Sequence, residues 1–204
     1  MNDTLSKPPT ITSLVFDFGG VIFINPQHPN MSPIEHDEIW AAVRSVAKDF
    51  QADLLAGTMS FETLTQVFHQ RTPRVHQPLR EHVLKSLAEP NAKVLSLIDH
   101  YHQQFPIYGL VNASPGWTEI RRGINGLDRH FTRVVPSHEV NVRKPDPEIF
   151  RHFLKVNNLR AQNCLFIDDQ PENVQAAGLL GFHTHHFTDV DTLEHRLKVL
   201  ADQP

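Results

Sequence analysis

Short apolar runs recur along the chain and predict the strands of a sheet. The first, Leu14–Phe16, is too short for a helix, and the β-branched and aromatic residues around it suit a strand that is buried on both faces. Helical segments separate most of the later runs. This order predicts an α/β fold with a doubly wound, mostly parallel sheet. The later runs lie at 105–111, 132–135 and 164–167, and a further short strand is expected near 182–187.

Helical periodicity fills the long interval between the first two runs. Ser32 is a suitable N-cap, Pro33 a first helical residue and Glu35 the returning carboxylate of a capping box. No convincing strand interrupts the helical segments that follow. We therefore expect a helical insertion, 26–104, within a core formed by 11–25 and 105–204. The further helices are expected near 61–68, 78–88 and 92–104.

Charge and cysteine content narrow the functional classes. The chain has 204 residues with a formal net charge of −4, and its lysines and arginines are scattered, which argues against nucleic-acid binding. No apolar stretch approaches the ~20 residues that a membrane span requires, and the first ten residues lack the apolar centre of a signal peptide. Cys164 is the single cysteine, which excludes an internal disulfide and indicates a buried thiol in a cytoplasmic protein.

Histidine is frequent, with fourteen residues, and three of them lie in the run His183–His186. His183 and His185 would share a face of a strand, so a zinc site is one interpretation of this run. The run contains no cysteine or carboxylate, however, and structural zinc sites commonly combine histidine with such ligands. We favour the interpretation that these are strand-end and surface histidines.

Polar residues gather where the predicted strands end. Asp17 follows the first run, Asn112 the second, and Asp168 and Asp169 the fourth, while Lys144 lies in the loop after the third. The carboxyl ends of parallel strands meet in one crevice, so one pocket can hold all five side chains. Three carboxylates repel one another and one lysine cannot neutralise them, so Mg2+ with oxygen ligands is expected. Lysine and Mg2+ beside a carboxylate suit a phosphate dianion.

Each of these residues also has a purely structural interpretation. Asp168 could cap the helix that follows Pro171, and Lys144 could be a solvated loop lysine. Asp17 beside Gly19 and the pair Asp168–Asp169 both end apolar strands, and this coincidence favours a functional site.

Three segments together resemble the haloacid dehalogenase-like hydrolase superfamily. They are Phe16-Asp17-Phe18-Gly19-Gly20-Val21, the stretch from Arg143 to Phe150 with its Lys144-Pro145-Asp146-Pro147, and Phe166 to Ala177 with its Asp168-Asp169. The branch that looks most similar contains sugar-phosphate phosphatases related to bacterial glucose-1-phosphatase and to the phosphatase domain of soluble epoxide hydrolases. The resemblance covers Val15 to about Phe187 and implies a Rossmann-like core with a small helical cap inserted after the first strand.

The resemblance also implies roles for individual residues. Asp17 would attack phosphorus and form an aspartyl-phosphate that water hydrolyses, and Lys144 would steady the nucleophile and the phosphate. Mg2+ would be held by the Asp17 carboxylate, the backbone carbonyl of Gly19 and the Asp169 carboxylate. Asp168 would either bind Mg2+ directly or hold its ligands in position.

Two positions depart from the pattern of the family. Most of its phosphatases have an acid two residues after the nucleophile, where this chain has Gly19, and a Ser or Thr before the asparagine of the second strand, where it has Val111. The side chain of Asn112, the amide of Ala113 and Ser114 are the groups available to hold phosphate instead. The sequence thus predicts a weak or specialised catalyst.

The expected activity is hydrolysis of a small phosphorylated metabolite, such as a sugar phosphate, with Mg2+. Substrate choice is expected to depend on the cap and on the loop after the first strand, where Asn25, His28, Trp40 and Arg44 are available. For Trp40, which lies in a helix of the cap, we favour a role in packing over contact with substrate. One alternative is a pseudo-enzyme that binds a phosphate ligand or a protein partner. A 2-haloacid dehalogenase, which needs no metal, is a further alternative, but the adjacent acids Asp168 and Asp169 argue against it.

Overall fold

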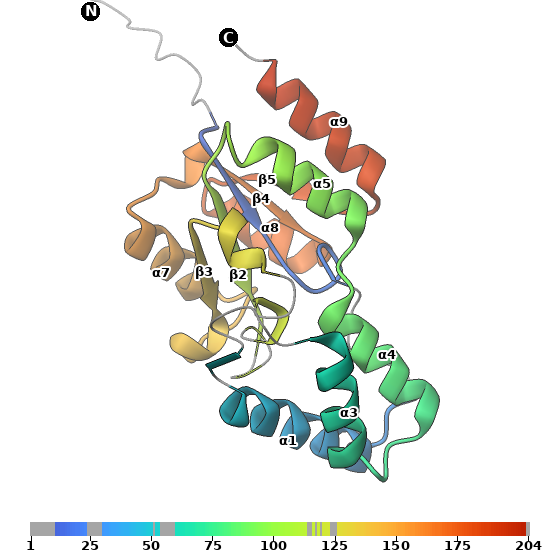
Figure 1. Cartoon of the computed structure of the whole chain (residues 1–204). Helices are drawn as coiled ribbons and strands as arrows, with labels where there is room; N and C mark the ends of the chain where they lie inside the picture. The colour runs from blue at the N-terminus through green and yellow to red at the C-terminus, as the bar shows by residue number, and fades with distance from the viewer. Residues whose placement is uncertain are drawn as a thin grey trace, which may run out of the picture.

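A parallel sheet of five strands forms the centre of the molecule (Figure 1). The computed structural model describes residues 11–23, 30–50, 52–53, 60–113, 116, 118, 120–122 and 126–202. All strand pairs are parallel and the order is β3-β2-β1-β4-β5, so the first strand lies in the middle. The predicted α/β architecture is confirmed. The strands are β1 (Ser13–Phe16), β2 (Ile107–Val111), β3 (Arg133–Pro136), β4 (Cys164–Asp168) and β5 (His183–His186).

The helices divide between two bodies (Figure 1). Three of them pack on one another in sequence, α1 on α3 and α3 on α4, below the sheet in this view. We call these three helices the lower body. The others cover the sheet, including α5, which packs against α9. The helices of range 26–104 are thus shared between both bodies, and the boundaries of a cap domain stay a prediction. The helices are α1 (Pro33–Asp49), α3 (Phe61–Arg71), α4 (Gln77–Ala88), α5 (Ala92–Tyr101), α7 (Pro147–Asn157), α8 (Pro171–Leu179) and α9 (Val190–Ala201).

Each face of the sheet has its own apolar core, because successive side chains of a strand point to opposite faces. Leu14 and Phe16 of β1 belong to the cluster that contains the apolar residues of α5, α9 and the lower body. Val15 belongs to the other cluster, with the apolar residues of α7 and α8. All four residues of β1 are buried. Helices on both faces explain why the strand reads as an unbroken apolar run.

The sequence misplaced the junction between α5 and β2 by a few residues. We expected the helix to continue to Gln104 and the strand to begin at Phe105, whereas the helix ends at Tyr101 and the strand begins at Ile107. The N–H groups of Gln104 and Phe105 both donate to the Tyr101 carbonyl, each at 2.9 Å, so the chain turns there. Local periodicity does not reveal such a turn, because Phe105 is apolar in either element.

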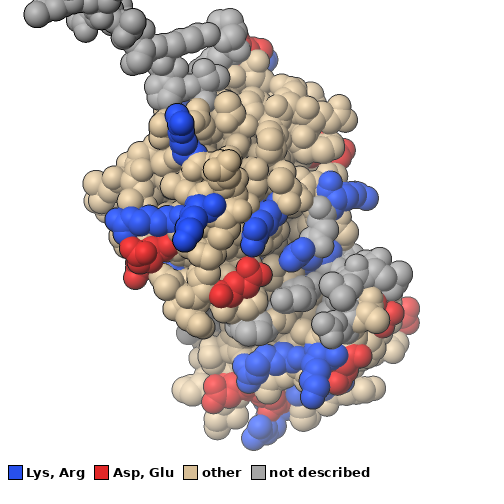
Figure 2. All heavy atoms as spheres, turned by 90° about the vertical axis from the view of Figure 1, so that its left-hand side faces the viewer, with Lys and Arg blue, Asp and Glu red and all other residues tan. Residues whose placement is uncertain are grey.

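The surface carries mixed charge on the face that Figure 2 shows. Lys and Arg side chains lie among Asp and Glu side chains there, in keeping with the scattered charges of the sequence. Within the described ranges, no helix combines the length and the apolar character needed to cross a bilayer. Cys164 is fully buried, as expected, and burial raises the pKa of its thiol to about 12.

The capping box predicted for α1 is present. The Glu35 N–H donates to Ser32 Oγ at 3.3 Å, and the Ser32 N–H donates to Glu35 Oε2 at 3.1 Å. These bonds satisfy backbone donors that have no partner within the helix. Together with Pro33 they determine where the helix begins.

Replacing Ser32 by Ala removes the side-chain acceptor of this box. We expect a loss of about 1 kcal/mol in the free energy of unfolding, measured by urea denaturation. Ser96→Ala is the matched control, because Ser96 Oγ bonds the Ala92 carbonyl within α5 and caps no helix end. Equal losses in both variants would contradict the capping role.

Candidate active site

Asp17 lies at the carboxyl end of the central strand. Its N–H donates to the Ile167 carbonyl of β4 at 2.9 Å, so the chain still follows the sheet at this residue. Because β1 pairs with β4, Asp17 comes beside Asp168 and Asp169, which end β4 and follow it. The three carboxylates, predicted from two separate segments, are therefore neighbours. Each offers an oxygen within 4.8 Å of the others.

Lys144 connects two of these acids. Its Nζ lies 2.9 Å from Asp17 Oδ1 and 2.7 Å from Asp168 Oδ2. The Lys144 side chain is 1% exposed, and those of Asp17 and Asp168 are 10% and 0% exposed. A solvated loop lysine is excluded by this burial. The ammonium instead compensates two buried carboxylates, which would otherwise be very costly to keep ionised.

Asp168 and Asp169 have different surroundings. Asp168 accepts from the Gln170 N–H at 2.9 Å and from Asn173 Nδ2 at 3.0 and 3.1 Å, besides its contact with Lys144. Both of its oxygens are thus engaged. Asp169 Oδ2 accepts from Gln170 Nε2 at 2.6 Å, but Asp169 Oδ1 is buried and has no hydrogen-bond partner. A buried carboxylate oxygen without a partner is an unfavourable arrangement that a cation would relieve.

The glycines after Asp17 make room for Asp169. Gly20 has φ +83°, and a Cβ at this position would lie 2.2 Å from Asp169 Oδ2. Any larger residue would therefore collide with the acid as well as strain the backbone. A Cβ at Gly19 would meet nothing within 4 Å. The two adjacent glycines are consequently not equivalent, and only Gly20 is required by the close approach.

Burial dominates the electrostatics of these groups. It raises the pKa of Asp17 to about 6, with Lys144 opposing the shift and Asp168 adding to it. Burial also raises the pKa of Asp169. Burial alone would lower the pKa of Lys144, but the carboxylates of Asp17 and Asp168 raise it. Lys144 is therefore a permanent cation, whereas Asp17 ionises fully only above about pH 6.

Asn112 binds the backbone of the lysine that completes the site. Asn112 Nδ2 donates to the Lys144 carbonyl at 2.9 Å, and the Lys144 N–H donates to Asn112 Oδ1 at 2.8 Å. The side-chain amide is thus engaged on both sides, and it positions Lys144. That Asn112 also contacts phosphate stays a prediction.

Ser137, which sequence reasoning missed, lies beside the expected phosphate-binding segment. Its Oγ accepts from the Ala113 N–H at 3.1 Å and donates to the Ala113 carbonyl at 3.2 Å. Ser137 follows β3 at its carboxyl end, so the rule that selected Asp17 and Asp168 could have found it. Ser114 lies outside the described residues, as do Asn25 and His28.

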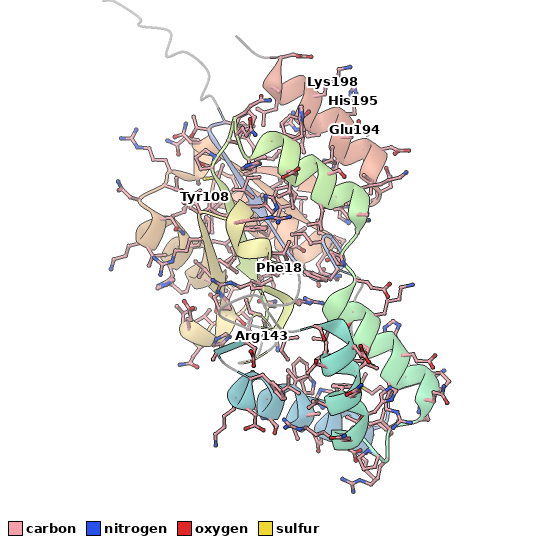
Figure 3. All side chains as sticks on the ribbon, viewed as in Figure 1. Phe18, Tyr108, Arg143, Glu194, His195 and Lys198 are labelled. Carbon is pink, nitrogen blue, oxygen red and sulfur yellow. The ribbon has the colours of Figure 1, made fainter. Side chains whose placement is uncertain are left out.

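Asp17, Lys144 and Asp169 line a cavity of about 780 Å³ between the sheet and the lower body. Helix α1 supplies His36, Trp40 and Arg44 to its wall, and the connection between β3 and α7 supplies Arg143, which lies between the core and α1 in Figure 3. The labelled side chains of α9 lie far from this region in the same view. Trp40 and Arg44, two of the four residues that we considered for substrate choice, therefore line the pocket.

Arg121 is a buried cation in this wall that the sequence did not reveal. It is 3% exposed, donates to the Ser86 carbonyl from Nε at 3.2 Å and from Nη2 at 3.0 Å, and has its guanidinium 4.5 Å from the centre of the Phe23 ring. Burial lowers its pKa to about 9, although Asp17 opposes the shift. It remains charged at neutral pH and adds to the positive potential of the pocket. No motif or spacing marks this arginine in the sequence.

The raised pKa of Asp17 predicts a pH-dependent cost in the metal-free protein. The folded state holds this proton more tightly than the unfolded state, so stability from this group is present below about pH 4 and is lost as pH rises to about 6. Relative to Asp17→Asn, the wild type should lose about 1 kcal/mol of unfolding free energy between about pH 5 and pH 7.5, measured by urea denaturation in EDTA. The variant removes the contribution of all other titrating groups from the comparison. A difference that does not change with pH would contradict the assignment.

Comparison with known proteins identifies two relatives that match most of this chain. The sesquiterpene phosphatase astK of Aspergillus oryzae is 25% identical over 88% of this chain and 91% of its own length. The drimenol cyclase drtB of Aspergillus calidoustus is 26% identical over 95% of this chain, but the chain spans only 37% of that protein.

Solved structures share the fold. A HAD-like family hydrolase from Porphyromonas gingivalis superposes with a TM-score of 0.60 at 23% identity, covering 96% of this chain and 100% of that one. A HAD family enzyme from Bacteroides thetaiotaomicron, in complex with magnesium and inorganic phosphate, superposes with a TM-score of 0.54 at 19% identity, covering 86% of this chain and 93% of that one.

The family model of the haloacid dehalogenase-like hydrolases matches residues 11–181, which include every described residue of the site. The narrower branch of glucose-1-phosphatases stays a prediction. With the fold, the acid cluster and this match in agreement, the chain belongs to the haloacid dehalogenase-like hydrolases.

Proposed function

We propose that this hydrolase is a Mg2+-dependent phosphatase that acts on a small organic phosphate ester through an aspartyl-phosphate on Asp17. The observation that carries the proposal is the contrast among the three acids. Lys144 and Asn173 engage Asp168, Lys144 reaches Asp17, and Asp169 keeps a buried oxygen without a partner. An acid cluster arranged in this way suits a hard cation with oxygen ligands.

The donor set fits Mg2+. Asp17 and Asp169 would hold it through their carboxylates, Gly19 would add its backbone carbonyl, and Asp168 would act mainly by holding Lys144. Once bound, Mg2+ would neutralise charge on the phosphate oxygens and help to orient the ester. The magnesium and phosphate in the related enzyme from Bacteroides thetaiotaomicron support this choice of cofactor.

The protein residues divide the reaction into two displacements. The Asp17 carboxylate attacks phosphorus while the bond from phosphorus to the ester oxygen breaks, and the alkoxide that leaves takes a proton from water. A water molecule then attacks the phosphorus of the aspartyl-phosphate, which releases inorganic phosphate and regenerates Asp17. Lys144 Nζ holds the nucleophile in place and faces the negative charge that develops.

The pocket supports a small anionic substrate. Its volume of about 780 Å³ falls within the usual range for small-molecule sites. Arg44, Arg121, Arg143 and Lys144 give it a cationic wall, while Trp40 offers an apolar surface. The Aspergillus oryzae relative is named as a sesquiterpene phosphatase, which adds support for phosphate esters with an apolar organic group.

The alternatives differ in what they require of the same residues. A pseudo-enzyme would agree with Gly19 and Val111, but it gives no reason for the buried charges of Asp17 and Lys144. A metal-independent dehalogenase gives no use for the unpartnered oxygen of Asp169. We therefore favour the phosphatase.

A panel of small phosphate esters, assayed with Mg2+ and with EDTA, tests the proposal. We expect phosphate release that requires Mg2+ and falls at least ~10³-fold in Asp17→Asn, because the nucleophile is lost. Chloride release from a 2-haloacid in EDTA would favour the dehalogenase instead. A folded protein that binds Mg2+ but hydrolyses no ester would identify the pseudo-enzyme.

Gly19→Asp tests the missing general acid. The open space at Gly19 accepts a side chain, and the new acid would protonate the leaving oxygen. We expect kcat to rise by as much as ~10²-fold for alkyl phosphates, and to change little for p-nitrophenyl phosphate, whose leaving group needs no proton.

Gly20→Ala is the matched control for this substitution, because its Cβ would collide with Asp169. It should lower kcat for both classes of ester. Equal stimulation of both classes by Gly19→Asp would contradict a role in protonating the leaving group.

A further inference from the structure

A second group of metal-ligating side chains lies away from the active site. It contains Asp99 and His102, near the C-terminus of α5, and His130, the last residue of the short helix η1 (Leu127–His130). One ligand atom of each residue lies within 4.8 Å of the others. This is not the run His183–His186 that the sequence singled out, and contact between α5 and η1 depends on the fold.

Two of the three ligands come from one face of a helix. Asp99 and His102 are three residues apart, which brings their side chains together. The Nδ1–H of His102 donates to the Asp99 carbonyl at 2.6 Å, because a carbonyl can only accept. His102 is therefore held as the tautomer whose Nε2 has a free lone pair. Histidine ligands in metal sites are commonly oriented by such a bond to a backbone carbonyl.

His130 supplies the third ligand from a buried position. Its side chain is 9% exposed, its Nδ1 has no hydrogen-bond partner, and this atom lies 3.6 Å from Asp99 Oδ1. Burial and the adjacent Arg129 lower the pKa of His130, against the opposing effect of Asp99. The ring is neutral in this structure, because its Nε2 accepts a hydrogen bond from Arg129 Nε and therefore carries no proton. A neutral imidazole, with a buried nitrogen that faces a carboxylate and a second histidine, is a suitable metal ligand.

One existing bond competes with metal binding. Arg129 Nε donates to His130 Nε2 at 2.8 Å, so the ring proton is on Nδ1 in the metal-free protein. A metal on Nδ1 requires this proton to move to Nε2 and Arg129 to turn away. Arg129 is exposed, so its guanidinium can exchange this bond for water at small cost.

We propose that Asp99, His102 and His130 form a zinc site that joins α5 to η1. Two imidazole nitrogens and one carboxylate oxygen suit Zn2+, with water in the fourth position. The hard oxygen donors around Asp17 suit Mg2+ instead, so the two sites differ in the metal they favour.

The position of this cluster favours a structural role. The segments that carry it lead directly into the first residues of β2 and β3, at the N-terminal ends of the parallel strands, whereas Asp17 follows the C-terminal end of β1. Zinc would connect the C-terminal end of α5 to η1, and it would stabilise the folded state by binding this state preferentially. It would not contact the reacting groups.

Isothermal titration of the full chain with Zn2+, after removal of metals and with excess Mg2+ present, tests the proposal. We expect one zinc per chain and a higher Tm with zinc. His102→Ala and Asp99→Ala should each weaken binding by about tenfold or more, since even residues that only support a ligand have effects of this size. Both positions are partly or fully exposed, so the variants should fold even if His130→Ala does not.

His100→Ala is the matched control, because His100 is an exposed histidine of the same helix and lies outside the cluster. Its zinc affinity should equal that of the wild type. Arg129→Ala should bind zinc more tightly, because the competing bond and a nearby cation are removed. Unchanged affinity in His102→Ala, or an equal loss in His100→Ala, would overturn the proposal.

Discussion

The buried contact of one lysine with two aspartates organises the active site of this hydrolase. Lys144 lies within hydrogen-bond distance of Asp17 and Asp168, and all three side chains are almost completely buried. Breaking a buried ion pair from one side typically costs about 3–5 kcal/mol, because the remaining charge is left uncompensated. Much of the surrounding structure is arranged to keep this contact intact.

Neighbouring polar side chains determine the position of each charge. Asn112 binds both backbone polar groups of Lys144, and Asn173 binds both oxygens of Asp168. Neither asparagine has to touch a substrate to matter for catalysis. The cost of burying the charges is thus offset by hydrogen bonds that also determine their geometry. Asp169 differs from Asp168 because one of its oxygens receives no such bond.

The side chains at the two ends of the parallel strands have different chemistry. At the carboxyl ends of the strands, buried acids and arginines surround a cavity that suits phosphate with Mg2+. At the N-terminal ends of β2 and β3, two histidines and an aspartate lie together on segments that lead into these strands. The length of the strands separates these two sites. Catalysis and structural cross-linking can therefore change independently in such a fold.

The sequence by itself determined the strands, the parallel sheet and the acids of the site. Apolar runs ended by Asp17, and by Asp168 with Asp169, sufficed for this, because strand burial and the position of strand ends are local properties. The tertiary structure alone decided that Asn112 binds Lys144, and that Arg121, Ser137 and the cluster around His130 have their present neighbours. These contacts join residues distant in sequence, and no local pattern encodes which of many polar side chains will meet. The different environments of Asp168 and Asp169 also depended on the fold, because adjacent residues of a strand end point in different directions.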